Sequence, residues 1–146
     1  MECITKTKKH ATLFIIIIGL FLIGTVLSVG ISDSPFGAYR ISTPEEAAAF
    51  LEDLGWNPDV QNITVKSSVL PEEFDTVFTE YNTLQIEQKC DLRNYAGKEI
   101  IVYTVPILNY SDNTESVYAT VIVHNERVIG GDIHSAKMDG FMHTLQ

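Results

Sequence analysis

The stretch VIVHNERVIGGDIHSA, residues 121–136, decides the fold that we expect for this chain. Strand-forming runs lie on both sides of Asn125 and Glu126, two residues that suit a tight turn. With these two at the turn, His124 lies opposite Arg127, and the pairing continues in step from there. The stretch therefore predicts a β-hairpin.

The expected pairing separates the side chains of this stretch that are capable of chemistry. It places Asp132 opposite Ala119, five residues along the strand from His124 and so roughly 17 Å away at ~3.3 Å per residue, whereas zinc ligands lie about 2.0–2.3 Å from the metal. Asp132 and His134 share one face of their strand, but two ligands are one fewer than a catalytic zinc needs. His143 would add a third only if the end of the chain folded back. We therefore expect no metal and no other cofactor.

Glycine and proline positions indicate irregularities in the predicted strands. Residues 99–110 form a long apolar run interrupted by Pro106, which has no N–H for a ladder and indicates an edge or a bulge. In the hairpin, Gly130 and Gly131 predict a bulge or a place where another side chain crosses the strand closely.

A further strand is predicted earlier in the chain, at residues 62–69. There Ile63, Val65 and Val69 alternate with polar residues. Alternation of this kind is typical of a strand with one buried face.

Local signals predict a complete helix that ends near residue 54. Thr43 is a good N-cap, Pro44 suits the first helical position, and Glu46 completes a capping box. Gly55 provides the left-handed stop, so Trp56 is expected to clamp the end of the helix; the alternative is a binding platform. The apolar face is expected to comprise Ala47, Phe50, Leu51 and Leu54.

A second helix is predicted to open at Pro71, with acidic residues near its positive end, and to end near Lys89 or Cys90. Asn82 and Gln85 are expected to lie beside its buried stripe. The residues of that stripe are Phe74, Val77, Phe78, Tyr81 and Leu84.

Residues 11–31 predict a transmembrane helix. No charged residue occurs between His10 and Asp33, and about 20 apolar residues span a hydrocarbon core roughly 30 Å thick. The lysines of residues 1–10 place that segment in the cytoplasm. We therefore expect a single-pass cell-membrane protein with a tether at residues 32–42 and an extracytoplasmic domain at residues 43–146.

The alternative to an uncleaved anchor is a signal peptide cut after Gly30, which would leave a secreted domain. The apolar run is longer than the roughly 7–15 residues of a typical signal core, so the anchor is preferred. Cys3 and Cys90 lie on opposite sides of the expected membrane, which excludes a disulfide within the chain. Cys90 is then a buried thiol, an intermolecular bridge or a nucleophile.

Charge limits the partners of the exported part. Residues 31–146 hold 7 Lys and Arg against 18 Asp and Glu. An acidic domain of this kind repels nucleic acid, so we do not expect nucleic acid to be a partner. The element order, a transmembrane helix followed by α-β-α-β-β-β, predicts an α+β domain whose two helices pack on one face of a small antiparallel sheet.

Four strings resemble an uncharacterised domain of clostridia and their relatives, the domain of unknown function 4830. They are FLEDLGW (50–56), PEEFDTVFTEYNTLQIEQKCDLRNYAGK (71–98), VYATVIVHNERVIGGDIHS (117–135) and DGFM (139–142). The resemblance covers nearly all of residues 41–142 and departs at Cys90, where the pattern tends to carry glycine. It implies a membrane-anchored or exported domain of the Gram-positive envelope, and it supplies no reaction.

Three functions remain open. The preferred hypothesis is a non-enzymatic module that binds a protein, a peptide or a small ligand outside the cell. The alternatives are an inhibitor or protease-modulating domain of propeptide-like fold, and an exported hydrolase whose polar groups converge from separate elements. The candidate ligand or partner contacts are Tyr81, Asn82, Gln85, Asp91, Asp132 and His134.

Overall fold

A computed structural model of the chain describes residues 34–111, 116–137 and 139–146. The predicted membrane segment, residues 11–31, lies outside the described residues, as does the predicted cytoplasmic segment before it. The described elements are α2 (Pro44–Asp53), β1 (Thr64–Val69), α3 (Thr76–Glu87), the short 3₁₀ helix η1 (Leu92–Tyr95), β2 (Glu99–Ile107), β3 (Val117–His124), β4 (Arg127–Ser135) and β5 (Met142–His143). The α+β class is confirmed, with β5 as an additional strand.

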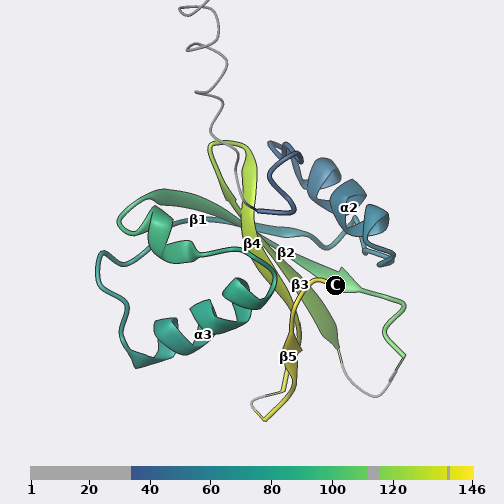
Figure 1. The fold of residues 1–146 in the computed structure, drawn as a ribbon. Coiled ribbons are helices and arrows are strands. Elements are labelled where there is room, and N and C mark those ends of the chain that lie inside the picture. Colours follow the sequence, from purple (N-terminus) through teal and green to yellow (C-terminus); the bar gives the residue numbers. More distant parts are fainter. Residues whose placement is uncertain (1–33, 112–115, 138) are drawn as a thin grey trace, which may run out of the picture. The chain divides into compact units, whose positions relative to one another are not determined.

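The sheet is antiparallel throughout and follows the chain in the order β1-β2-β3-β4-β5. The two helices lie on opposite faces of it (Figure 1). The expectation of both helices on one face is therefore wrong. Buried residues of β2 and β3 point to both faces of the sheet, so each face must pack against another element.

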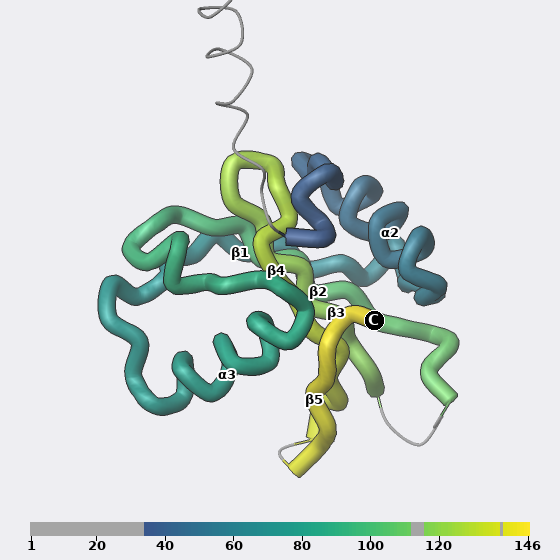
Figure 2. Tube along the Cα trace, in the orientation of Figure 1, coloured from purple at the N-terminus to yellow at the C-terminus, as the bar shows by residue number. Residues whose placement is uncertain are grey.

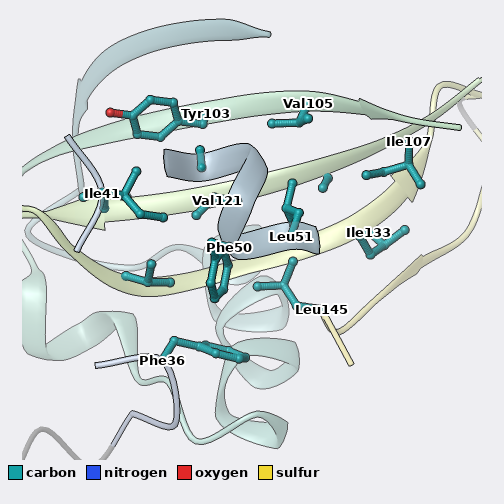
Figure 3. Close-up of a cluster of buried hydrophobic side chains, with 14 of the residues drawn as sticks. Phe36, Ile41, Phe50, Leu51, Tyr103, Val105, Ile107, Val121, Ile133 and Leu145 are labelled. Carbon is teal, nitrogen blue, oxygen red and sulfur yellow. The ribbon is translucent and has the colours of Figure 1, made fainter. Parts of the chain in front are cut away.

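The larger core lies between the sheet and α2. Figure 3 shows Phe50 and Leu51 of α2 packed against Val105, Val121 and Ile133 of the strands. The smaller core lies on the α3 side of the sheet, and its buried residues are Leu70, Leu92, Ile100, Ile122 and Ile129.

Helix α2 begins and ends as its sequence predicts. The Thr43 side chain accepts from the Glu46 N–H while Glu46 bonds back to the backbone, which completes the capping box. Gly55 has φ 93°, and the N–H of Trp56 donates to Leu51 O at 3.0 Å, the long bond of a Schellman motif.

The hairpin turn is also confirmed, but the register beyond it is not. Asn125 and Glu126 have φ of 47° and 63°, as in a type I′ turn. A β-bulge then shifts the pairing by one residue, because Ile129 is left without a partner. Asp132 lies opposite Thr120 and not opposite Ala119.

The part of the predicted tether that is described, residues 34–42, belongs to the folded domain. Phe36 and Ile41 are buried in the core under α2, and Ile41 N–H donates to Glu126 O at 2.8 Å. Phe36 and Tyr39 both pack edge-on against Phe50. Burial of Phe36 and Ile41 thus holds this segment in the folded domain, although its composition is typical of turns.

Helix α3 starts later than predicted and buries a different face. Asp75 is its N-cap and accepts from the Phe78 N–H at 2.8 Å, so the helix does not open at Pro71. Val77, expected in the buried stripe, is 71% exposed. The fully buried residues of the helix are polar, namely Asn82 and Gln85.

Pro106 lies in the part of β2 that extends beyond the end of β1. The pairing of β1 with β2 begins at Thr64 opposite Thr104, two residues before the proline. Pro106 O accepts from the Asp59 N–H at 2.8 Å, so the backbone of Pro106 points away from β3. The missing N–H breaks no bond with β3. Beyond the end of β1, Pro58 bridges Ile107, so Pro106 lies beside an isolated bridge and not at an open edge.

Candidate functional site

The six candidate contact residues lie around α3, η1 and β4, in a set of hydrogen bonds that we call the α3 brace. The brace comprises Tyr81, Asn82, Gln85, Gln88, Asp91, Asp132 and His134. Sequence analysis missed Gln88, although it follows Gln85 at i+3 and therefore lies on the same helix face.

Gln85 acts as a substitute for a neighbouring strand. Its side-chain amide donates to Gly131 O at 3.0 Å and accepts from Gly131 N–H at 2.9 Å. A Cβ atom on Gly130 would come within 2.7 Å of Gln85 Oε1, so glycine is needed where this side chain crosses. The bulge and the close crossing predicted from the two glycines are both confirmed.

Gln88 links the brace to residues 141–146, which we call the closing segment. Its amide nitrogen donates to Gly131 O at 2.6 Å, and its Oε1 accepts from the Leu145 N–H at 3.1 Å. Trp56 Nε1 donates to Leu145 O at 2.8 Å. Figure 2 shows the closing segment, in yellow, running from β5 back to the middle of the domain.

Asn82 and Asp91 fix the start of η1. Asn82 Nδ2 donates to Asp91 Oδ1 at 2.9 Å, and Asn82 Oδ1 accepts from the Leu92 N–H at 2.8 Å. The guanidinium of Arg93 binds both carboxylate oxygens of Asp91, at 2.9 and 2.7 Å. The hydrogen bonds from Arg93 hold the pKa of Asp91 well below its usual range, so the carboxylate stays ionised.

Tyr81, Asp132 and His134 form a chain of hydrogen bonds that ends near the surface. Tyr81 Oη donates to Asp132 Oδ2 at 2.6 Å, and His134 Nδ1 lies 2.7 Å from Asp132 Oδ1. Asp132 is 2% exposed, whereas the His134 side chain is 26% exposed. Burial, followed by the charge of Asp132, raises the pKa of Tyr81 well above its ordinary value.

This arrangement orients the His134 ring. A carboxylate only accepts hydrogen bonds, so a neutral His134 carries its proton on Nδ1 and presents Nε2 as an acceptor. The ring of Tyr118 stacks on His134 at a centroid distance of 5.9 Å.

The described residues contain no group of three His, Cys, Asp or Glu side chains arranged to hold a metal ion. The end of the chain does fold back, because β5 pairs with β4. However, His143 lies opposite Ile133 and shares its face, the one covered by α2, whereas Asp132 and His134 lie on the face covered by α3. His143 bonds instead to Tyr110 Oη and Thr144 O, at 3.2 and 2.7 Å.

Trp56 belongs to an aromatic cluster at the end of the sheet. Its ring stacks on Tyr110 at a centroid distance of 6.1 Å and lies 6.3 Å from His143. Phe141 stacks on Tyr110 at 4.7 Å. The backbone of Trp56 ends α2 as predicted, and its side chain holds the closing segment.

Cys90 is a free, buried thiol. Its Sγ lies 3.3 Å from Ser34 Oγ, and burial raises the pKa of the thiol. A buried thiol with a raised pKa is a poor nucleophile. Of the readings left open for Cys90, the structure favours the structural one.

Strand β1 presents an exposed edge. Val65 and Val69, expected on a buried face, are 47% and 58% exposed. Among the described residues the strand pairs with β2 alone. The alternation of NITVKSSV predicts the strand correctly, but it does not reveal that α2 leaves this end of the sheet uncovered.

The family model described as Domain of unknown function (DUF4830) matches residues 50–133. The chain belongs to this family. The DUF4830 region includes every candidate contact residue except His134, and it ends before the closing segment. No curated protein and no solved structure matches the chain.

In the ranges that the structure describes, no helix is both long enough and apolar enough to cross a membrane. The segment predicted to do so, residues 11–31, is outside those ranges.

Proposed function

We propose that the chain is a non-enzymatic binding module of the bacterial envelope. Residues 11–31 anchor it in the cell membrane, residues 1–10 remain in the cytoplasm, and the α+β domain faces the outside. The uncharged apolar run and the lysines before it support this orientation.

The contrast between the α3 brace and the edge of β1 carries the proposal. Most polar side chains of the α3 brace are engaged with one another or with backbone, as in the pairs Tyr81–Asp132 and Asn82–Asp91, while the part-exposed His134 keeps Nε2 as an acceptor. In the described part of the chain, the outer edge of β1 has no strand beside it, and Val65 and Val69 are exposed on it. Open strand edges bind extended segments of other chains through backbone hydrogen bonds. The partner is therefore a protein or peptide that adds a strand to β1.

Photo-crosslinking in the full-length chain tests this function. A photoreactive amino acid replaces Val65 in one variant and Val77 in a control, because both valines are exposed but only Val65 lies on the strand edge. We expect a crosslinked product in intact membranes at Val65 and little at Val77. Equal yields at the two positions would contradict binding at β1.

A further inference from the structure

The outer edge of β1 has a defined set of backbone groups. Leu70 N–H donates to Lys98 O, and Leu70 O accepts from Gly97 N–H, so the backbone of Leu70 points toward the β2 side. These groups alternate between the two edges of a strand from one residue to the next. Val65, Ser67 and Val69 therefore direct their N–H and C=O groups outward, with Ser67 at the centre.

We propose that the strand that pairs with this edge is β1 of a second copy of the chain. The two β1 strands run antiparallel about a twofold axis at Ser67, so that Ser67 lies opposite its own counterpart. Val65 of each copy then lies opposite Val69 of the other, and every outward residue finds a partner. This inference rests on the proposed function, because it names the partner for the same edge.

Charge and proline positions select this register over its neighbours. A twofold axis at Lys66 would place two lysines directly opposite each other, which is destabilising. An axis at Ser68 would place Val65 opposite Pro71, which has no N–H to donate. With the axis at Ser67, Lys66 lies opposite Ser68, so no like charges face each other.

The charge of the strand favours a second copy over a basic partner. The domain is acidic, yet β1 carries no acidic residue and a single lysine, Lys66. Lys66 would repel a basic strand at close range. The other residues of β1 are uncharged, so two copies of the strand can pair without charge repulsion between them.

The side chains of β1 that lie on the α2 face of the sheet also favour pairing with a second copy. Val65 pairs with the buried Tyr103 of β2, so it continues the apolar surface beyond α2 to the sheet edge. Pairing two copies joins Val65 and Val69 across the interface, and cross-strand pairs of β-branched residues stabilise a sheet. Anchoring both copies in one membrane raises their effective concentration, which favours a contact of limited area.

Engineered cysteines test the pairing in the full-length chain in membranes. Ser67→Cys and its control Ser68→Cys are made in a Cys3→Ser background, and the remaining thiol, Cys90, is buried. At the proposed axis the two copies of residue 67 have Cα atoms about 5.5 Å apart, within the range of a disulfide. The two copies of residue 68 are diagonal neighbours about 7–8 Å apart, beyond the limit for bridging.

Under a mild oxidant we expect Ser67→Cys to form a disulfide-linked dimer on a non-reducing gel, with at least about tenfold less dimer for Ser68→Cys. Equal dimer yields, or dimer from Ser68→Cys alone, would overturn the proposed pairing. So would a monomer from both variants whose far-ultraviolet circular dichroism matches the parent.

The crosslink at Val65 separates the two proposals. A product of twice the chain mass supports both of them. A product with a different protein, together with no Ser67→Cys dimer, overturns the second copy and leaves the binding module standing. A failure to crosslink at Val65 overturns both.

Discussion

At the scale of single residues, Gln85 has the largest structural role of the candidate contacts. Strand β5 pairs with β4 only at Ile133 and His134, so the backbone of Gly131 has no strand partner on that side. The Gln85 side-chain amide bonds to both the N–H and the C=O of Gly131. An unsatisfied buried N–H or C=O group is costly, so Gln85 stabilises a strand that is too long for its neighbour, and Gln88 adds a second bond to Gly131 O.

Replacing Gln85 with alanine should therefore destabilise the domain. We expect a loss of about 1–3 kcal/mol, because the buried N–H of Gly131 is left without an acceptor. Gln61→Ala is the matched control, since Gln61 is exposed and only its backbone N–H takes part in a described bond. The midpoint of urea unfolding measures both; similar midpoints for the two variants would contradict the role of Gln85.

Contacts within a strand were predictable, and contacts between elements were not. The alternation of side chains along a strand places Asp132 and His134 on one face, and they do bond to each other. Their link to Tyr81 depends on which face of the sheet α3 covers, and no local pattern encodes that. The one-residue error in the hairpin register arose beside another such contact, because the bulge at Ile129 lies next to Gly130, where Gln85 crosses the strand.

At the scale of elements, the two helices differ in how much of them the sequence predicts. The ends of α2 are set by capping groups within a few residues, so both were predictable. In α3 the inner face is polar, with Asn82 and Gln85 buried. A pattern that counts apolar residues places such a helix incorrectly, as the exposed Val77 shows.

The contact between α2 and the closing segment is testable at Trp56. Trp56→Ala should cost about 3 kcal/mol, near the low end for loss of a buried aromatic ring, because the ring is only half-buried. Trp56→Phe keeps a ring and removes the bond to Leu145 O, so it should cost about 1 kcal/mol.

Leu108→Ala provides the control for these variants. Leu108 is an exposed apolar residue near the aromatic cluster, and its replacement should change stability by less than about 0.5 kcal/mol. Unfolding free energies from guanidinium titration give the ranking. If Trp56→Ala behaves like Leu108→Ala, the closing segment does not depend on Trp56.

At the scale of the whole molecule, the α+β class was predictable from the order of the elements, while the layering was not. The apolar run of β2 has buried residues on both faces, including Ile100 toward α3 and Val105 toward α2. A run of this kind indicates a strand covered on both sides. The three-layer arrangement follows once that property is combined with two helices.

The proposed topology is tested with epitopes at the two ends of the full-length chain. Protease added to intact cells should digest an epitope after Gln146 and spare one before Met1, because the proposed span at residues 11–31 would leave the N-terminal end behind the membrane. Permeabilised cells should lose both epitopes. A mature chain in the medium that begins at Ile31 would instead establish cleavage after Gly30.

The closing segment also limits how early in synthesis the domain can complete its core. Leu145 completes the core under α2, and its backbone takes up bonds from Trp56 and Gln88. Every other described residue leaves the ribosome before residues 141–146 do. Until then Gln88 Oε1 and Trp56 Nε1 lack these partners and the edge of β4 lacks β5, so a nascent chain that holds the other described elements has an incomplete core. The core under α2 is therefore complete only after residues 141–146 have left the ribosome and paired.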